Sequence, residues 1–137
     1  MIRMRSNVLL VLAFAGILLA QPEGNQILGI WNTDDGDSKI EIVKCGDMFC
    51  GSIKSMKNPR NDERNSNPSL QSRPLVGLQV LKGFKYAGSN SWSGGTLYAP
   101  KRGREMSAKL KLSTPDSLEI KISAGMASRT VVWTRDK

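Results

Sequence analysis

The chain has 137 residues with two cysteines and no histidine, and 20 Lys and Arg against 12 Asp and Glu give a formal net charge of +8. The lack of histidine excludes Ser-His and Cys-His nucleophile pairs and every His-ligated metal site. The sequence also lacks a Gly-x-Ser-x-Gly elbow, a Gly-x-Gly-x-x-Gly loop and a phosphate loop. We therefore expect no catalytic residue, no cofactor and no metal ion.

The N-terminal 20 residues have the pattern of a signal peptide. Arg3 and Arg5 precede an apolar run over residues 8–19, which ends at Ala20. Twelve apolar residues are too few for a membrane span, which needs about 20. We expect cleavage after Ala20 and a periplasmic or secreted protein without an integral membrane span. An uncleaved N-terminal anchor remains the alternative, because Leu18 stands where a cleavage site prefers a small residue.

Cleavage would leave 117 residues, with 18 Lys and Arg against 12 Asp and Glu. This length is enough for one domain and too short for two. We expect a short linker over residues 21–27 and a single β-barrel domain over residues 28–137.

Most of this domain alternates between apolar and polar residues, which is typical of half-buried strands. Turn-forming residues divide it into eight predicted strands at 29–33, 39–45, 49–56, 76–86, 92–98, 106–113, 118–123 and 129–135. We place Val76, Leu78, Val80 and Phe84 on one strand face, and Trp92, Gly94, Thr96 and Tyr98 on another. The clearest pair is 106–113 with 118–123, where one face is apolar and the other polar, as in an antiparallel sheet. We find no amphipathic helix, so the predicted fold class is all-β.

Two polar segments interrupt the strands. Residues 34–38 contain three Asp and a Gly, and we interpret them as a turn, because the spacing does not continue into a twelve-residue calcium loop with a terminal Glu. Residues 57–73 are rich in Asn and Pro and form the one long connection. Long ordered loops are often functional. The sequence supports a binding loop and a plain surface loop equally.

The first and last predicted strands carry the residues that a closed barrel needs. Gly29 and Trp31 lie on the first strand, and Trp133 and Arg135 lie on the last. Pairing these strands removes both sheet edges. We expect the Arg135 guanidinium to lie on the Trp31 indole, a contact worth about 0.5–2 kcal/mol, with Gly29 allowing the close approach. The alternative is an open sheet with two unrelated apolar tryptophans.

The two cysteines flank a predicted hairpin turn. Cys45 and Cys50 are separated by Gly46-Asp47-Met48-Phe49, and a four-residue loop would place them directly opposite each other. Two cysteines so placed in an exported chain indicate a structural disulfide. A redox-active pair would normally have the Cys-x-x-Cys spacing.

Several short motifs occur in an order that resembles a known family. They are Gly29-Ile30-Trp31, Cys45 with Cys50-Gly51, Asn67-Pro68-Ser69-Leu70, Arg73-Pro74-Leu75-Val76-Gly77-Leu78, Trp92-Ser93-Gly94-Gly95, Tyr98-x-Pro100 with Gly103, and Trp133-Thr134-Arg135. Over nearly all of its mature length the chain resembles the bacterial exported family called domain of unknown function 2147. The resemblance implies an eight-stranded, up-and-down, lipocalin- or calycin-like barrel and no assigned activity. Members of that family usually have Asp where this chain has Ala99.

The interior of an eight-stranded barrel is either filled by side chains or holds one small ligand. We expect binding of a small, partly apolar or amphipathic ligand, or of an envelope component. The candidate ligand-binding residues are Arg73, Phe84, Trp92, Tyr98 and Met106.

Two other functions stay open. The first is a filled-core interaction protein whose basic outer face, with Lys109, Lys111 and Lys121, meets an anionic envelope surface. The second is a carboxylate-dependent hydrolase using Asp62 and Glu63, although adjacent carboxyls usually point apart, whereas a glycosidase holds two across a cleft. We do not expect an enzyme. The exported compartment, rather than the charge, argues against nucleic acid as a partner.

Overall fold

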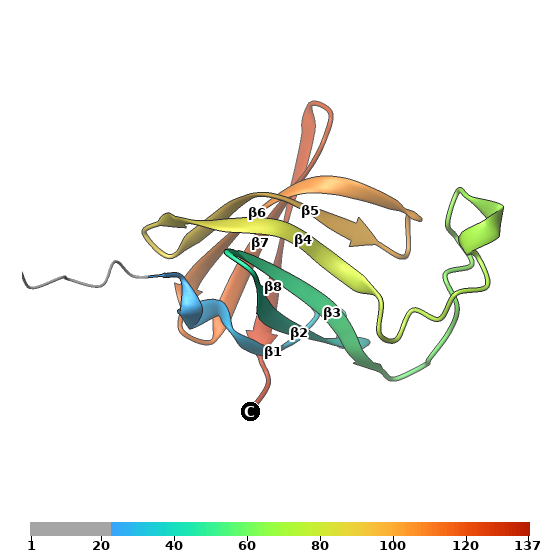
Figure 1. The fold of residues 1–137 in the computed structure, drawn as a ribbon, viewed down its shortest axis with the longest axis horizontal. Coiled ribbons are helices and arrows are strands. Elements are labelled where there is room, and N and C mark those ends of the chain that lie inside the picture. Colours follow the sequence, from blue (N-terminus) through green and yellow to red (C-terminus); the bar gives the residue numbers. More distant parts are fainter. Residues whose placement is uncertain (1–22) are drawn as a thin grey trace, which may run out of the picture.

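The computed structural model describes residues 23–137, so the expected signal peptide over residues 1–20 lies outside the described part of the chain. The described chain forms a closed antiparallel barrel in which each strand pairs with the next and the last returns to the first (Figure 1). The strands are β1 (Gly29–Asn32), β2 (Ser38–Cys45), β3 (Met48–Met56), β4 (Gln79–Gly88), β5 (Ser91–Ala99), β6 (Arg104–Thr114), β7 (Ser117–Ala124) and β8 (Ala127–Arg135). The predicted eight-stranded barrel is confirmed.

The described chain holds two 3-10 helices, η1 (Asn25–Ile27) and η2 (Pro68–Leu70). Within residues 23–137, neither the length nor the apolar character of any helix suffices to cross a lipid bilayer.

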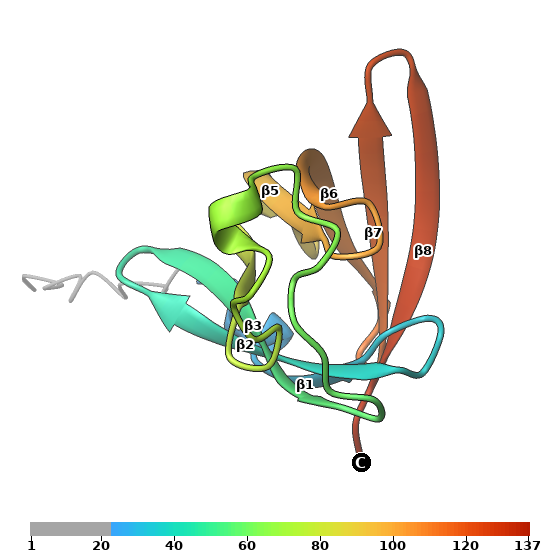
Figure 2. The ribbon, with the colours of Figure 1, turned by 90° about the vertical axis from the view of Figure 1, so that its right-hand side faces the viewer.

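The barrel closes through a very short pairing. β1 pairs with β8 only at Trp31 with Arg135 and at Asn32 with Thr134. The rest of β8 pairs with β7 alone among the described strands, as far as Ala124 opposite Ala127. The β7–β8 hairpin therefore extends past the other strands as an arm (Figure 2).

One end of the barrel is closed by large side chains. Trp31, Phe49, Phe84 and Trp92 are all buried, and the Phe49 and Trp92 rings meet edge to face with centroids 6.4 Å apart. The helix η1 completes this end, because Ile27 is fully buried and its carbonyl oxygen accepts a hydrogen bond from Trp31 Nε1 at 3.0 Å. Ile27, expected to belong to a linker, thus packs into the barrel core.

β4 begins later than its sequence pattern predicts. The prediction placed the exposed Val76 on an inward face, but this residue precedes the strand. The loop backbone forms other hydrogen bonds there, from Leu75 N to Arg60 O at 3.0 Å and from Gly77 N to Ile53 O at 2.7 Å. These contacts hold the chain in the loop up to Gln79.

β5 contains a register shift that changes which residues face inward. The shift lies between Trp92 and Gly95, where Gly94 has a φ of 81°. Beyond it, Leu97 pairs with the buried Met106, and Tyr98 pairs with the exposed Glu105. Because side chains alternate across a strand, Leu97 faces the interior and Tyr98 faces outward. The prediction of one shared face for Trp92, Gly94, Thr96 and Tyr98 is therefore wrong, because a bulge adds one residue to the count.

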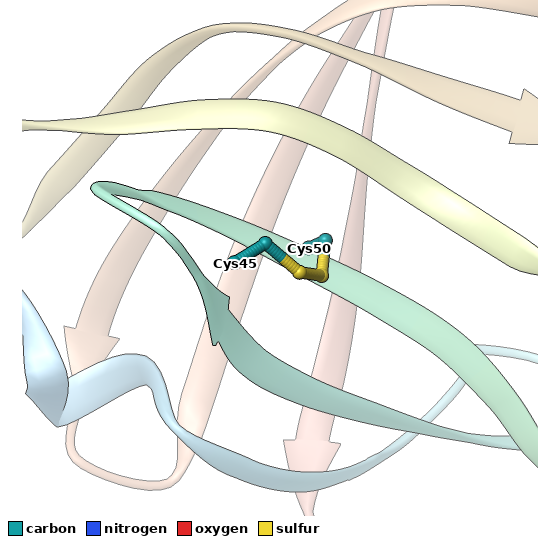
Figure 3. The surroundings of a disulfide bond; sticks show 2 residues. All are labelled: Cys45 and Cys50. Atoms are coloured by element: carbon teal, nitrogen blue, oxygen red, sulfur yellow. A yellow bond between two sulfur atoms is a disulfide. The ribbon is translucent and has the colours of Figure 1, made fainter.

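The predicted disulfide joins Cys45 to Cys50, with Cα atoms 5.9 Å apart (Figure 3). The predicted four-residue loop is wrong, since Cys45 pairs with Met48 and Cys50 pairs with Val43. The turn itself is the two residues Gly46-Asp47. The disulfide therefore crosses the hairpin diagonally between residues on one face of the β2–β3 ladder.

Candidate functional site

A cavity of about 330 Å³ lies at the end of the barrel opposite η1. Its floor is apolar and comes from Ile40, Ile53, Leu97, Met106 and Trp133. These residues lie on β2, β3, β5, β6 and β8, so the inward faces of most strands contribute. The volume falls in the range of small-molecule sites, which is about 300–1,000 Å³.

The rim of the cavity is charged and is tied together by two ion pairs. Lys101 on the β5–β6 turn binds Asp35 on the β1–β2 turn, with Nζ 2.6 Å from Oδ2. Arg60 on the long loop binds Asp37, with Nη1 3.0 Å from Oδ2. Both pairs join segments far apart in the sequence, so they fix the rim turns relative to each other.

Asp35 is held in its ionised form. Burial by itself would raise the pKa of its carboxyl, but hydrogen bonds from Lys101, the Asp37 backbone and Thr33 outweigh it and lower the pKa to about 2. The carboxylate therefore stays negative at neutral pH and keeps its contact with Lys101.

Two further arginines on the rim have no such partners. Arg102 follows Lys101 on the β5–β6 turn, and Arg129 lies on β8 opposite Ile122 of β7. Neither forms an ion pair or a side-chain hydrogen bond with any residue between 23 and 137. Their guanidinium groups are thus free, within the described chain, to meet a negative group.

The long loop is fixed to the outside of the barrel by a buried carboxylate. Asp62 is 1 % exposed. It accepts hydrogen bonds from Tyr98 Oη at 2.5 Å, Asn65 Nδ2 at 2.9 Å and Arg73 Nε at 2.9 Å. Burial would raise the pKa of Asp62, but these three donors lower it below 3.8. The Arg73 guanidinium also lies 5.5 Å from the Tyr98 ring centroid, so four side chains form one network.

The turn after β5 gives the loop a second attachment. Arg64 Nη1 donates to the Lys101 carbonyl oxygen at 3.0 Å. Gly103 has a φ of 67°, and the Arg64 carbonyl oxygen occupies the space that a Cβ at Gly103 would need. The loop is therefore an ordered part of the fold, and its Arg60 contributes to the cavity rim.

The barrel fold agrees with the comparisons with known proteins. Residues 29–135 match the family model described as "Uncharacterized protein conserved in bacteria (DUF2147)". The chain belongs to the DUF2147 family. A solved structure with a similar fold is Helicobacter pylori protein HP1028, which is described as belonging to the lipocalin family. It has a TM-score of 0.73 and 23% sequence identity, over 80% of this chain and 82% of that chain. Among curated proteins, none matches this sequence significantly.

The candidate binding residues fall into three groups in this DUF2147 barrel. Met106 lies in the cavity floor, and Tyr98 contributes to the rim although its hydroxyl bonds to Asp62 on the outer side. Phe84 and Trp92 are buried and are not among the residues that line the cavity. Arg73 is also outside the lining and is paired with Asp62.

Arg129 lines the cavity, although it was not among the binding residues predicted from the sequence. Counting back in steps of two from Trp133 leads through Val131 to Arg129, and all three line the cavity. The alternation on β8 was therefore a usable signal for an inward arginine. No comparable signal in the sequence marked Ile40 or Ile53 as floor rather than filled core.

Ala99 lies in the cavity wall. Its carbonyl oxygen accepts hydrogen bonds from Arg102 N at 3.0 Å and Gly103 N at 2.8 Å. Backbone hydrogen bonds therefore hold this turn, and they do not depend on which side chain is present at position 99. The methyl group makes this part of the wall apolar.

The two loop carboxylates are in different environments. Asp62 is enclosed in its network, whereas Glu63 is exposed. Within residues 23–137 no group of three or more His, Cys, Asp or Glu side chains is placed to hold a metal ion.

Proposed function

We propose that this DUF2147 protein is an exported binding protein that carries a small, partly apolar molecule in the cavity at the open end of its barrel. One observation carries the proposal. The barrel is packed with aromatic side chains at the η1 end, whereas about 330 Å³ remains at the other end above an apolar floor. Filling such a space with an apolar group removes hydrophobic surface from water, which favours binding.

Native mass spectrometry of gently purified protein tests the proposal. We expect a reproducible added mass that disappears after denaturation. A clean unliganded mass across several preparations, together with no binding of apolar probes, would contradict it.

A cavity-filling variant makes the test specific to this site. Ala124 of β7 lines the cavity, whereas its neighbour Ser123 is exposed on the outer face. Ala124→Phe should reduce the amount of copurified ligand, and Ser123→Phe should leave it unchanged. Thermal unfolding of both variants establishes that each is folded.

Export is tested separately. The apolar run over residues 8–19 supports it, and in a bacterial host we expect mature protein in the periplasmic or culture fraction with Gln21 as its first residue. Protein retained with Met1 in the membrane fraction would instead support an uncleaved anchor.

A second function is favoured by a separate observation on the outer face. Lys109 of β6 is directly opposite Lys121 of β7, and neither forms an ion pair within residues 23–137. Like charges facing each other destabilise a sheet, and an anionic surface would relieve that repulsion. Cosedimentation with anionic vesicles should fall steeply with salt if this face binds envelope surfaces, whereas the burial of an uncharged apolar chain in the cavity should not.

A further inference from the structure

We propose that the ligand of the open-end cavity is an amphipathic anion, whose apolar chain lies on the floor and whose negative head lies at Arg102 and Arg129. This inference rests on the proposed function, and it adds the chemical class of the ligand.

The position of Arg129 is the first argument. On β8 the inward residues Trp133 and Val131 continue the apolar floor, and Arg129 is the next residue on that face. Its pairing partner Ile122 is apolar and also lines the cavity. An arginine at the end of an apolar stripe can extend along it and present its guanidinium at the mouth.

The charges on the rim give the second argument. The lining contains four cationic residues (Arg60, Lys101, Arg102 and Arg129) and three carboxylates (Asp34, Asp35 and Asp37). Two cations are neutralised by Asp35 and Asp37. Asp34 is the one remaining carboxylate of the lining, and it is exposed and forms no ion pair with residues 23–137. The rim therefore retains an excess of positive charge at its mouth.

The apolar floor limits the polarity and the length of the part of the ligand that lies in the cavity. Its residues are apolar and present no ionisable group apart from the rim, so a charged or strongly hydrated group would lose its water there without compensation. At roughly 30 Å³ for each water-sized group, the cavity holds a chain of about ten carbon atoms. A guanidinium forms paired hydrogen bonds with both carboxylate and phosphate, so the geometry specifies an anionic head and leaves its chemistry to the experiment.

Isothermal titration calorimetry of the mature protein with four ligands of equal chain length tests this class. Decanoate and decyl phosphate carry the two anionic heads, decanol carries no charge and decylammonium carries the opposite charge. We expect the anions to bind about tenfold more tightly than decanol, and decylammonium to bind most weakly. The preference of the anions over decanol should decrease as salt is raised.

Variants assign the preference to the two arginines. Arg129→Gln and Arg102→Gln should each weaken anion binding by about three- to fivefold, as for a partly exposed ion pair, and leave decanol binding unchanged. Lys85→Gln removes the same charge from an exposed residue of β4 that does not line the cavity, and it should change neither affinity.

The outcomes separate the two proposals. Equal binding of decanol and the anions, or anion binding that both Gln variants leave intact, would overturn the inference while the binding function stands. If none of the four ligands binds but native mass spectrometry finds another bound molecule, the inference is again overturned and the binding function stands. If no probe binds and the purified protein carries no ligand, both are overturned.

Discussion

The guanidinium of Arg135 lies over the indole of Trp31, with its carbon 4.3 Å from the ring centroid. Its Nη1 donates to the Leu28 carbonyl oxygen at 2.8 Å, and its Nη2 donates to that of Gln26 at 2.8 Å. One side chain from the last strand therefore contacts both the first strand and the segment that closes the barrel. Because β1 and β8 share only two paired positions, this contact supplies much of the connection between them.

Trp31→Ala should lower the free energy of unfolding by about 3–5 kcal/mol, because the lost aromatic leaves a cavity in the core. Trp31 is fully buried, and its loss also removes the hydrogen bond to Ile27 and the face on which Arg135 lies. Urea unfolding of the variant and the parent measures the difference. A loss below 1 kcal/mol would contradict the role of this residue in barrel closure.

Gly29→Ala should destabilise the protein through its contact with Arg135. Gly29 has a φ of 133°, and a Cβ there would lie 2.8 Å from Arg135 Nη1. Gly77→Ala is the matched control, since Gly77 has a φ of 90° with no atom within 4 Å of the added Cβ. Gly77→Ala should lower the free energy of unfolding by about 1–2 kcal/mol through backbone strain alone. Gly29→Ala should lower it by more, as measured by urea unfolding.

A double-mutant cycle isolates the contact between these two positions. Gly29→Ala combined with Arg135→Ala should cost less than the sum of the single changes, by about 0.5–3 kcal/mol. Strict additivity of the two losses would show that Gly29 is needed for its φ alone.

Replacing both cysteines by serine should lower the free energy of unfolding by about 2 kcal/mol. The disulfide closes a short loop, and its removal restores a small amount of chain entropy to the unfolded state. The ligand affinity should be unchanged, because neither Cys45 nor Cys50 lines the cavity. Chemical denaturation of oxidised parent and variant measures the first effect, and an affinity change of more than twofold would contradict the second.

Asp62→Asn should destabilise the fold by about 1–3 kcal/mol, because it removes the charged acceptor shared by Tyr98, Asn65 and Arg73. Glu63→Gln is the control, since this exposed neighbour forms no ion pair with residues 23–137, and it should change stability by less than about 0.5 kcal/mol.

The contribution of Asp62 to the free energy of unfolding should also depend on pH. Its pKa is lowered in the folded protein from 3.8, so the folded state binds fewer protons than the unfolded state as pH falls. The stabilisation that the ionised Asp62 provides is complete above its pKa of 3.8 in the unfolded chain. It is lost as pH falls through the lower pKa of the folded protein. The stabilities of the parent and Asp62→Asn should therefore converge below about pH 4, and a constant difference between pH 7 and pH 3 would contradict this account.

Local patterns in the sequence determined most of the barrel. Alternation between apolar and polar residues located all eight strands, and it succeeded best for β6 and β7, which pair regularly from Ser107 opposite Ser123 to Leu112 opposite Leu118. It failed where the backbone departs from a two-residue repeat. The bulge at Gly94 turned Tyr98 outward, and the loop contacts of Leu75 and Gly77 delayed the start of β4. The Gly94-Gly95 pair inside a strand is compatible with a bulge but does not by itself establish one, and the loop contacts leave no mark in the order of residues.

The candidate site was likewise only partly predictable from the sequence. Composition and spacing alone identified an all-β chain, the disulfide partners, and the residues Gly29, Trp31 and Arg135 that meet where the barrel closes. Only the tertiary structure decided which end of the barrel is filled and which is hollow. The reason is physical, because the space inside depends on how side chains from six or more strands fit together, whereas alternation states only which way each side chain points. Phe84 and Trp92 therefore pack the closed end, and Arg129 reaches the open cavity.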